Sequence, residues 1–173
     1  SRWRLVETAW SLNLDSSMIT FDSDEKTFLT RDRRKNITSA RAALNGYQKG
    51  KCFYCFKKIE IISGHQELAD VDHLFPHILQ RMGLLTNLDG VWNLVLACQN
   101  CNRGPRGKFD SVPHIRYVER LEKRNNFLIA SHHPLRETLI KQTGESFSKR
   151  HEFLQACLNT ARKYQPSVWQ TEE

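Results

Sequence analysis

Residues 52–55 read CFYC and residues 98–101 read CQNC, so two cysteine pairs of equal spacing frame the central part of this chain. Between the pairs lie VDH at residues 71–73 and WN at residues 92–93, and Asn102 follows directly on the second pair. Thiols, carboxylates, imidazoles and amides are the side chains that bind metals and accept protons. We therefore expect the rest of the chain to pack around a metal-built centre located here.

The paired cysteines Cys52, Cys55, Cys98 and Cys101 have the spacing of a zinc site. Two residues between the members of a pair let one turn offer both sulfurs to one ion, and four thiolates form the closed tetrahedral set of structural zinc sites. Such a site leaves no position for water, so the zinc would hold shape and do no chemistry. Thiol redox chemistry at one pair and a plain zinc-ribbon binding module are the other interpretations. The fifth cysteine, Cys157, is expected to be a buried, inert thiol on a helix.

Composition limits the class of protein. A chain of 173 residues can form one domain that buries roughly 70% of its unfolded surface. The 26 Lys and Arg against 19 Asp and Glu give a net charge of +7, which favours a polyanionic partner such as nucleic acid. The sequence has no apolar run of 18 residues and no secretory signal, so we expect a cytoplasmic protein without a membrane partner. Because the chain begins with Ser1, we expect either a trimmed chain or the C-terminal part of a larger protein.

Apolar periodicity predicts an α+β fold in which helices from both ends surround the centre. Before the centre we expect a short helix within residues 2–12, a hairpin or irregular loop within 13–30, and an amphipathic helix at about 31–48 that Gly50 ends. Within it we expect a β-hairpin at 56–70, a long loop at 74–92 with one or two helical turns in 78–85, a short buried strand at 93–97, and a short helical piece at the second cysteine pair, broken by the GPRG of residues 104–107.

After the centre we expect two helices. One begins at Pro113, and the longest lies within residues 145–164, where Pro166 ends it before a loose tail. In the first of these, the residues expected to face inward are Ile115, Val118 and Leu121, and those expected to face outward are Arg116, Arg120, Lys123 and Arg124. The chain is then organised as an N-terminal helical and hairpin segment (1–50), the metal-built core (51–110) and a C-terminal helical segment (111–173) of one compact domain.

Asp72, His73 and Asn102 have the chemistry that phosphodiester hydrolysis needs. A base must deprotonate water, and a hard cation must neutralise the charge that builds on the phosphate and on the departing oxygen. A histidine, with an ordinary pKa of about 6.5, accepts a proton near neutral pH. The oxygens of Asp72 and Asn102 suit Mg²⁺. Because consecutive strand residues point to opposite faces, Asp72 and His73 need a bend or a twisted strand end to reach one site.

Four motifs in this order resemble the HNH family of ββα-metal nucleases, also called His-Me finger nucleases, in the form that carries a four-cysteine zinc. The motifs are CFYC at 52–55, VDHLFP at 71–76, WNLVLAC at 92–98 and CQNCN at 98–102, followed by Lys108. The resemblance covers residues 51–108, about a third of the chain. It implies a small ββα-metal core with a zinc site of four cysteines, surrounded by the N- and C-terminal helices.

The resemblance also implies a role for each matching residue. His73 would be the general base, and Asn93 would steady the loop that presents it. Asp72 and Asn102 would hold a catalytic Mg²⁺, for which Mn²⁺ can substitute. The products would be a 5′-phosphate and a 3′-hydroxyl. One departure is the GPRG of residues 104–107, which interrupts the helix of the family soon after Asn102.

The leading hypothesis is a Mg²⁺-dependent endonuclease for which DNA is favoured over RNA as the substrate, with double-stranded DNA as its partner and dimerisation left open. A non-catalytic zinc-containing module that only binds nucleic acid is the alternative, and a protein-interaction domain that keeps the zinc alone is the third. For the basic side chains and the loop histidine near the centre, phosphate contact competes with a simple solvated surface. The candidates for phosphate contact are His77, Arg106, Lys108, Arg103 and Arg34.

Overall fold

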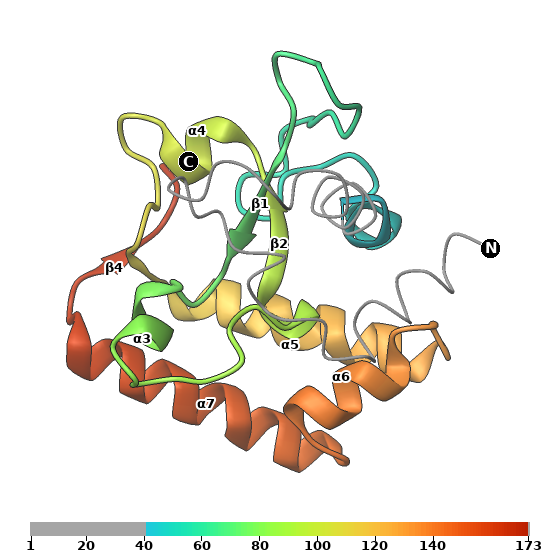
Figure 1. Ribbon diagram of the computed structural model, residues 1–173, viewed down its shortest axis with the longest axis vertical. Coiled ribbons are helices and arrows are strands. Elements are labelled where there is room, and N and C mark those ends of the chain that lie inside the picture. Colours follow the sequence, from blue (N-terminus) through green and yellow to red (C-terminus); the bar gives the residue numbers. More distant parts are fainter. Residues whose placement is uncertain (1–40, 173) are drawn as a thin grey trace, which may run out of the picture.

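The structure, a computed structural model, describes residues 41–172 (Figure 1). The segments expected at 2–12 and 13–30, the first part of the helix at 31–48, and Arg34 lie outside the described residues. Residues 41–48 are helical, and a turn follows in which Gly50 has a φ of 75°. A left-handed glycine is the usual end of a helix, so the predicted stop at Gly50 is confirmed.

Two short antiparallel strands form the centre of the fold. They are β1 (Asp70–His73) and β2 (Leu94–Ala97), and Asp72 lies opposite Val95. Every residue of β2 is buried, as predicted for residues 93–97. The helix α4 (Gln99–Arg103) follows at once and contacts β1. In Figure 1, α4 lies at one end of the strand pair and the C-terminal helices lie at the other, which gives the predicted α+β architecture.

The predicted β-hairpin at 56–70 is wrong in its pairing. β1 pairs with β2, and the segment before it forms only the isolated bridges Lys51–Lys58 and Glu60–Leu68. A tight turn at the first cysteine pair is the reason: the Cys52 amide donates to the Lys57 carbonyl, 2.8 Å away, and Phe56 has a φ of 60°. The turn uses the residues that a regular strand would have needed.

The loop from 74 to 92 contains the helical turn that the sequence predicts. This turn is α3 (Ile78–Arg81), and the 3₁₀ helix η2 (Val91–Asn93) leads into β2. The predicted short helix at the second cysteine pair is also confirmed, because α4 has five residues. It ends where Gly104 lies against Asn100, since a Cβ at Gly104 would stand 2.6 Å from the Asn100 carbonyl oxygen.

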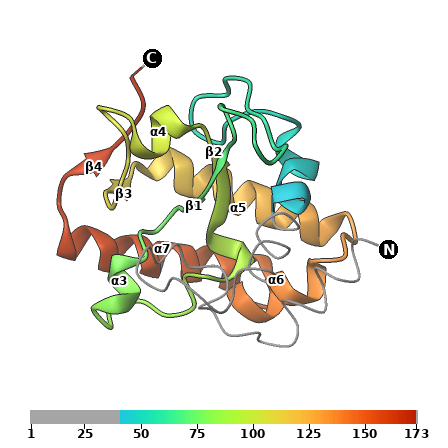
Figure 2. The same cartoon turned by 45° about the horizontal axis from the view of Figure 1, so that its top comes forward.

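Three helices pack against one another beneath the strand pair (Figure 2). They are α5 (Ile115–Ala130), α6 (Arg136–Thr143) and α7 (Phe147–Tyr164). The longest, α7, confirms the prediction for residues 145–164, and Cys157 on it is buried as expected. Sequence periodicity did not predict α6. None of the helices in the described part of the chain combines the length and the apolar character needed to cross a bilayer.

The tail after Pro166 is ordered against the core, so its prediction as a loose segment is wrong. The parallel strands β3 (Val112–Pro113) and β4 (Val168–Trp169) pair with each other. Trp169 holds this pair in place, because its ring stacks on Tyr117 at 5.7 Å between centroids. Pro113 is therefore in a strand, and α5 begins two residues later, with the side chain of His114 as its N-cap.

Arg124 was expected to face solvent, and the structure corrects this. Its guanidinium is fully buried and donates to the backbone carbonyls of Val91, Trp92 and Leu94 and to the side chain of Asn125. These carbonyls lie where η2 passes into β2, where the Val91 carbonyl also accepts from the Leu94 amide and the Trp92 carbonyl also accepts from the Asn125 Nδ2. Burial lowers the pKa of Arg124 to about 10, so the side chain remains charged at neutral pH.

Candidate metal centre and active site

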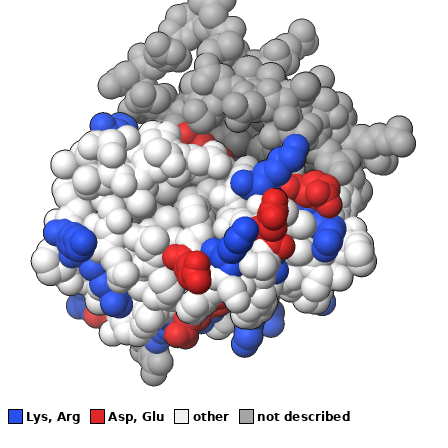
Figure 3. All heavy atoms as spheres, turned by 90° about the horizontal axis from the view of Figure 1, so that it is seen from below, with Lys and Arg blue, Asp and Glu red and all other residues white. Residues whose placement is uncertain are grey.

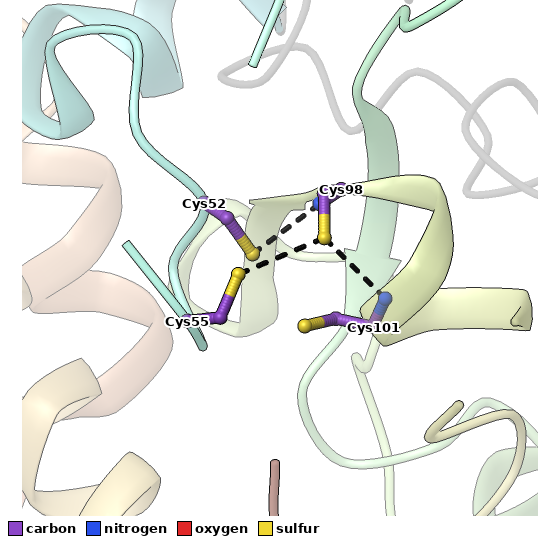
Figure 4. Close-up of side chains that lie close together, drawn as sticks. All are labelled: Cys52, Cys55, Cys98 and Cys101. Carbon is purple, nitrogen blue, oxygen red and sulfur yellow. Dashed lines mark hydrogen bonds between the residues drawn. The ribbon is translucent and has the colours of Figure 1, made fainter. Parts of the chain in front are cut away.

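The four paired cysteines come together from two segments of the chain (Figure 4). Cys52 and Cys55 lie on the tight turn before β1, which we call the knuckle (residues 52–58), whereas Cys98 caps α4 and Cys101 lies within it. Their sulfur atoms all lie within 4.8 Å of one another. Among the described residues, these four form the one group of three or more His, Cys, Asp or Glu side chains with metal-ligand spacing.

The geometry and the donor chemistry both fit zinc. A Zn–S distance of about 2.3 Å places the sulfurs of a tetrahedral site about 3.8 Å apart, and the Sγ atoms of Cys55 and Cys98 lie 3.8 Å apart. Four soft sulfur donors without a nitrogen or oxygen ligand make a closed structural site. The predicted four-cysteine metal site is therefore present in the fold.

Backbone amides prepare two of the sulfurs for negative charge. The Cys98 amide donates to the Cys52 Sγ at 3.3 Å, and the Cys101 amide donates to the Cys98 Sγ at 3.4 Å. Hydrogen bonds from the Cys101 and Cys52 thiols lower the pKa of the Cys98 thiol. Hydrogen bonds with the Cys52 and Cys98 thiols raise the pKa of the Cys101 thiol. A divalent cation removes this conflict, because it stabilises all four thiolates together.

The knuckle is also clamped by α5. Arg120 donates to the backbone carbonyls of Phe53 and Tyr54, and its guanidinium lies 4.3 Å from the ring centroid of Phe56. The side chain thus satisfies carbonyls that the turn leaves without partners and stacks on its aromatic residue. The knuckle, and with it Cys52 and Cys55, is thus held by the helical layer as well as by the sulfur cluster.

Asp72 lies near the end of β1, where the sequence places it, and its carboxylate is engaged by two neighbours. Its Oδ2 accepts a hydrogen bond from the Tyr54 hydroxyl at 2.5 Å and lies 3.2 Å from the Lys108 Nζ. Lys108 also donates to the His73 carbonyl at 2.8 Å. Burial, together with the Asp72 carboxylate, raises the pKa of Tyr54 well above its usual value, so its hydroxyl remains a donor.

His73 binds a different carboxylate. Its Nε2 lies 2.8 Å from the Oδ1 of Asp89, which is almost fully buried. Two further side chains approach Asp89 Oδ2: the Nε2 of His77 at 3.4 Å and the Nε2 of Gln80 at 3.3 Å. Asp72 and His73 therefore face different partners, as successive strand residues do.

Asn93 ties together two parts of the loop that follows β1. Its Oδ1 accepts from the Phe75 amide at 2.8 Å, and its Nδ2 donates to the carbonyls of Phe75 at 3.0 Å and of Leu88 at 2.9 Å. Asn93 is fully buried, so its side chain is closed off from solvent. These hydrogen bonds join the Phe75 and Leu88 ends of the loop, and the role of Asn93 in presenting His73 stays a prediction.

Asn102 does not contact Asp72. Its Nδ2 donates to the Oδ2 of Asp70 at 2.9 Å, and the Arg103 Nε donates to the same oxygen at 2.8 Å. Asp70 and Asp72 are two residues apart in β1, so both carboxylates point to the face of the strand on which α4 packs. The structure thus brings Asn102 to this face, although Asp72, His73 and Asn102 each bind another partner.

The residues expected at a phosphate backbone differ in their surroundings. Lys108 is fully buried and bonded as above. Arg103 is paired with Asp70, and Arg106 is exposed and pairs with Glu172. His77 is partly exposed beside Asp89. Figure 3 shows that the face formed by the C-terminal helices carries Lys and Arg interspersed with Asp and Glu, so no region of one sign dominates there.

Sequence reasoning missed three carboxyl or hydroxyl groups of this site: Tyr54, Asp70 and Asp89. Asp70 carries a usable signal, because the spacing of Asp70-Val-Asp72 places two carboxylates on one strand face. Asp89 has no such signal in the sequence. It contacts His73 across a loop of 15 intervening residues, and no local sequence pattern predicts the path of that loop. No family model, curated protein or solved structure matches this chain.

Proposed function

We propose that the protein is a metal-dependent endonuclease of the HNH type that hydrolyses phosphodiester bonds, with DNA as its favoured substrate. One observation carries the proposal: β1 and β2 pair with each other and α4 follows β2, with a carboxylate-bound histidine at the end of β1 and the sulfur cluster at the start of α4. The basic composition, with a net charge of +7, supports a polyanionic substrate.

The sulfur cluster has a structural role in this proposal. Zn²⁺ held by the four cysteines joins the knuckle to α4, and Asn102 follows directly on the ligand Cys101. Because α4 has only five residues, its own hydrogen bonds cannot fix its orientation. The zinc would therefore fix the position of Asn102 beside β1.

The reaction begins when His73 takes a proton from a water molecule. The water oxygen attacks phosphorus, the bond between phosphorus and the 3′ oxygen breaks, and the departing oxygen takes a proton from solvent, which leaves a 5′-phosphate and a 3′-hydroxyl. Asp72 and Asn102 are the residues proposed to hold Mg²⁺, and Mn²⁺ can take its place. When bound, the cation would neutralise the charge that builds on the phosphate.

The ion pair between Asp72 and Lys108 distinguishes the nuclease from the non-catalytic alternative. To bind a metal, Asp72 must exchange the ammonium group for the cation, and its charge is compensated in both states. If the exchange does not occur, the ion pair is purely structural and the protein is a non-catalytic zinc-containing module that binds nucleic acid. The buried position of Lys108 is the observation that favours this second candidate.

The test is cleavage of a supercoiled plasmid with Mg²⁺, with Mn²⁺ and with EDTA. We expect the wild type to cut in either metal and His73→Ala to lose at least about 100-fold in rate, because general bases contribute about that much or more. His151→Ala is the matched control, since this exposed histidine pairs with Glu122 on the helical layer; it should cut normally. Zinc content and the unfolding midpoint confirm that each variant is folded.

Three results would contradict this proposal or a part of it. If the wild type fails to cut DNA in the presence of any divalent metal but binds DNA with salt-sensitive affinity, the protein is the zinc-containing binding module. A wild type that neither cuts nor binds DNA would be a protein-interaction domain. Retention of cleavage by His73→Ala would remove His73 from the mechanism.

A further inference from the structure

Asp89 lies at a point where three segments meet. Its carboxylate contacts His73 at the end of β1 and Gln80 in α3, and its own backbone belongs to the loop before η2. The side chain is 3% exposed, whereas that of His73 is 13% exposed. A buried carboxylate is costly unless it is bonded, and this one is bonded on both oxygens.

We propose that Asp89 is a positioning residue that holds His73 as the tautomer with its proton on Nε2, so that Nδ1 is the nitrogen that accepts the proton from water. The inference rests on the proposed nuclease function and deepens it by assigning a role to a residue outside the four motifs. It concerns a residue that acts through His73 and does not touch the substrate.

The hydrogen bond decides the tautomer. An ionised carboxylate only accepts hydrogen bonds, so the 2.8 Å contact between His73 Nε2 and Asp89 Oδ1 requires the proton to be on Nε2. A neutral imidazole carries one ring proton, and Nδ1 is therefore left with a free lone pair. Although burial acts in the opposite direction, the hydrogen bond from His73 lowers the pKa of Asp89, so its carboxylate is ionised at neutral pH.

The second oxygen fixes the orientation of the carboxylate. His77 and Gln80 both approach Oδ2, which leaves Oδ1 to His73. Gln80 also accepts from the Leu88 amide at 2.7 Å, so the residue before Asp89 is tied to the same side chain. Gly90 follows, and a Cβ there would meet the Trp92 ring at 2.7 Å. The backbone on both sides of Asp89 is thus held in place.

The same contact has a second consequence during the reaction. When Nδ1 takes the proton from water, the imidazole becomes a cation with a proton on each nitrogen. The Asp89 carboxylate then lies against a positive charge at hydrogen-bond distance and stabilises it. A charge formed in the reaction is thereby compensated without any movement of the chain.

The first experiment replaces Asp89 by asparagine in the full chain and measures plasmid cleavage. An amide can present either a donor or an acceptor to Nε2, so it no longer fixes the tautomer. We expect kcat to fall by about two to four orders of magnitude and KM to stay within about twofold, because the residue does not touch the substrate. Glu137→Gln, the same chemical change at an exposed site on α6, should leave both constants unchanged.

The second experiment does not depend on cleavage. Nitrogen NMR of the zinc-loaded full chain labelled in histidine, recorded at about pH 8.5, well above the ordinary histidine pKa of about 6.5, reports which ring nitrogen of His73 carries the proton. We expect the proton on Nε2 in the wild type and a mixture of tautomers in Asp89→Asn. Because the wild-type spectrum needs no variant, a variant that fails to fold does not block the test.

The results separate this inference from the nuclease proposal. If the wild type has its His73 proton on Nδ1, or if a folded Asp89→Asn keeps kcat within about twofold, the positioning role is refuted. If the wild type does not cleave any substrate but shows the Nε2 tautomer and loses it in Asp89→Asn, the contact is real and the nuclease function alone has failed.

Discussion

Arg124 carries a full positive charge into the interior and uses it to bind carbonyl groups rather than a carboxylate. Its partners are the backbone oxygens where η2 becomes β2, directly around Asn93. A guanidinium has five donors in a fixed plane, which lets one side chain bind several acceptors where the backbone changes from one element to the next. The path of the chain at Asn93 therefore depends on a residue of α5.

Replacing Arg124 by methionine tests this dependence. Methionine keeps the bulk of the side chain but removes the guanidinium hydrogen bonds to the carbonyls of Val91, Trp92 and Leu94. We expect a loss of about 3 kcal/mol in the free energy of unfolding, measured by urea denaturation, because buried acceptors lose charged partners. The neighbouring exposed Lys123→Met should change stability by less than about 0.5 kcal/mol. An equal effect of both variants would contradict the role of Arg124.

At the scale of single residues, the sequence predicted side-chain chemistry better than side-chain direction. The four cysteines and the buried thiol of Cys157 follow from spacing and residue type, and both are confirmed. Arg124 was misplaced because a periodic pattern treats each arginine as a surface charge. Which carbonyls remain without partners inside the fold depends on distant segments, and no local pattern contains that information.

Among the elements, α4 depends most on the sulfur cluster. It has five residues, with Cys101 among them and Cys98 as the N-cap, so two of the four clustered cysteines lie in or next to it. A helix this short does not persist on its own in water. The zinc would thus act as the tertiary contact that a longer helix would make with its apolar face.

Removal of the metal tests this dependence. We expect purified protein to contain one zinc per chain, and a chelator to lower the free energy of unfolding by several kcal/mol, because the metal binds only the folded arrangement. Acid should have the same effect, since affinity falls as the thiolates become protonated. Cys98→Ala should lose the zinc, whereas Cys157→Ala should retain it. Full zinc occupancy in Cys98→Ala, measured by metal analysis, would contradict the four-cysteine site.

The elements also show where local patterns fail. The buried run of β2 and the apolar periodicity of α7 are strong local signals, and both elements were predicted. The hairpin at 56–70 was wrong because the isoleucines there resemble a strand, whereas the cysteine turn takes up the adjacent residues. The helix α6 was missed because its sequence is mostly polar, and it is held by packing on α5 and α7.

In the whole molecule, the C-terminal tail returns to the metal end of the fold. In Figure 1 the last residues run up from α7 past β4 to α4. Trp169 contacts the ring of Tyr54 at 5.1 Å between centroids and donates from its Nε1 to the Arg106 carbonyl at 2.9 Å. Because Tyr54 also bonds Asp72, the tail supports a residue of the proposed active site.

Replacing Trp169 by alanine should therefore affect stability and activity together. We expect a loss of about 2 kcal/mol in unfolding free energy, less than for a fully buried tryptophan. If the nuclease proposal is correct, cleavage should also slow, because Tyr54 loses a ring that restrains it. Val168→Ala, at a neighbouring exposed position, is the control and should change neither property. A folded Trp169→Ala of normal stability would show that the tail is not integral to the domain.

Because Lys108 is buried against Asp72, its chemical reactivity reports on the state of that carboxylate. Amine-directed labelling reagents modify lysines that they can reach, and the ammonium of Lys108 is completely covered, with the carboxylate of Asp72 and the carbonyl of His73 as its neighbours. Protection of Lys108 in a footprinting experiment would indicate that this carboxylate still holds its internal counterion. Labelling of Lys108 that appears only when magnesium is added would indicate that the metal has displaced its ammonium group from the Asp72 carboxylate.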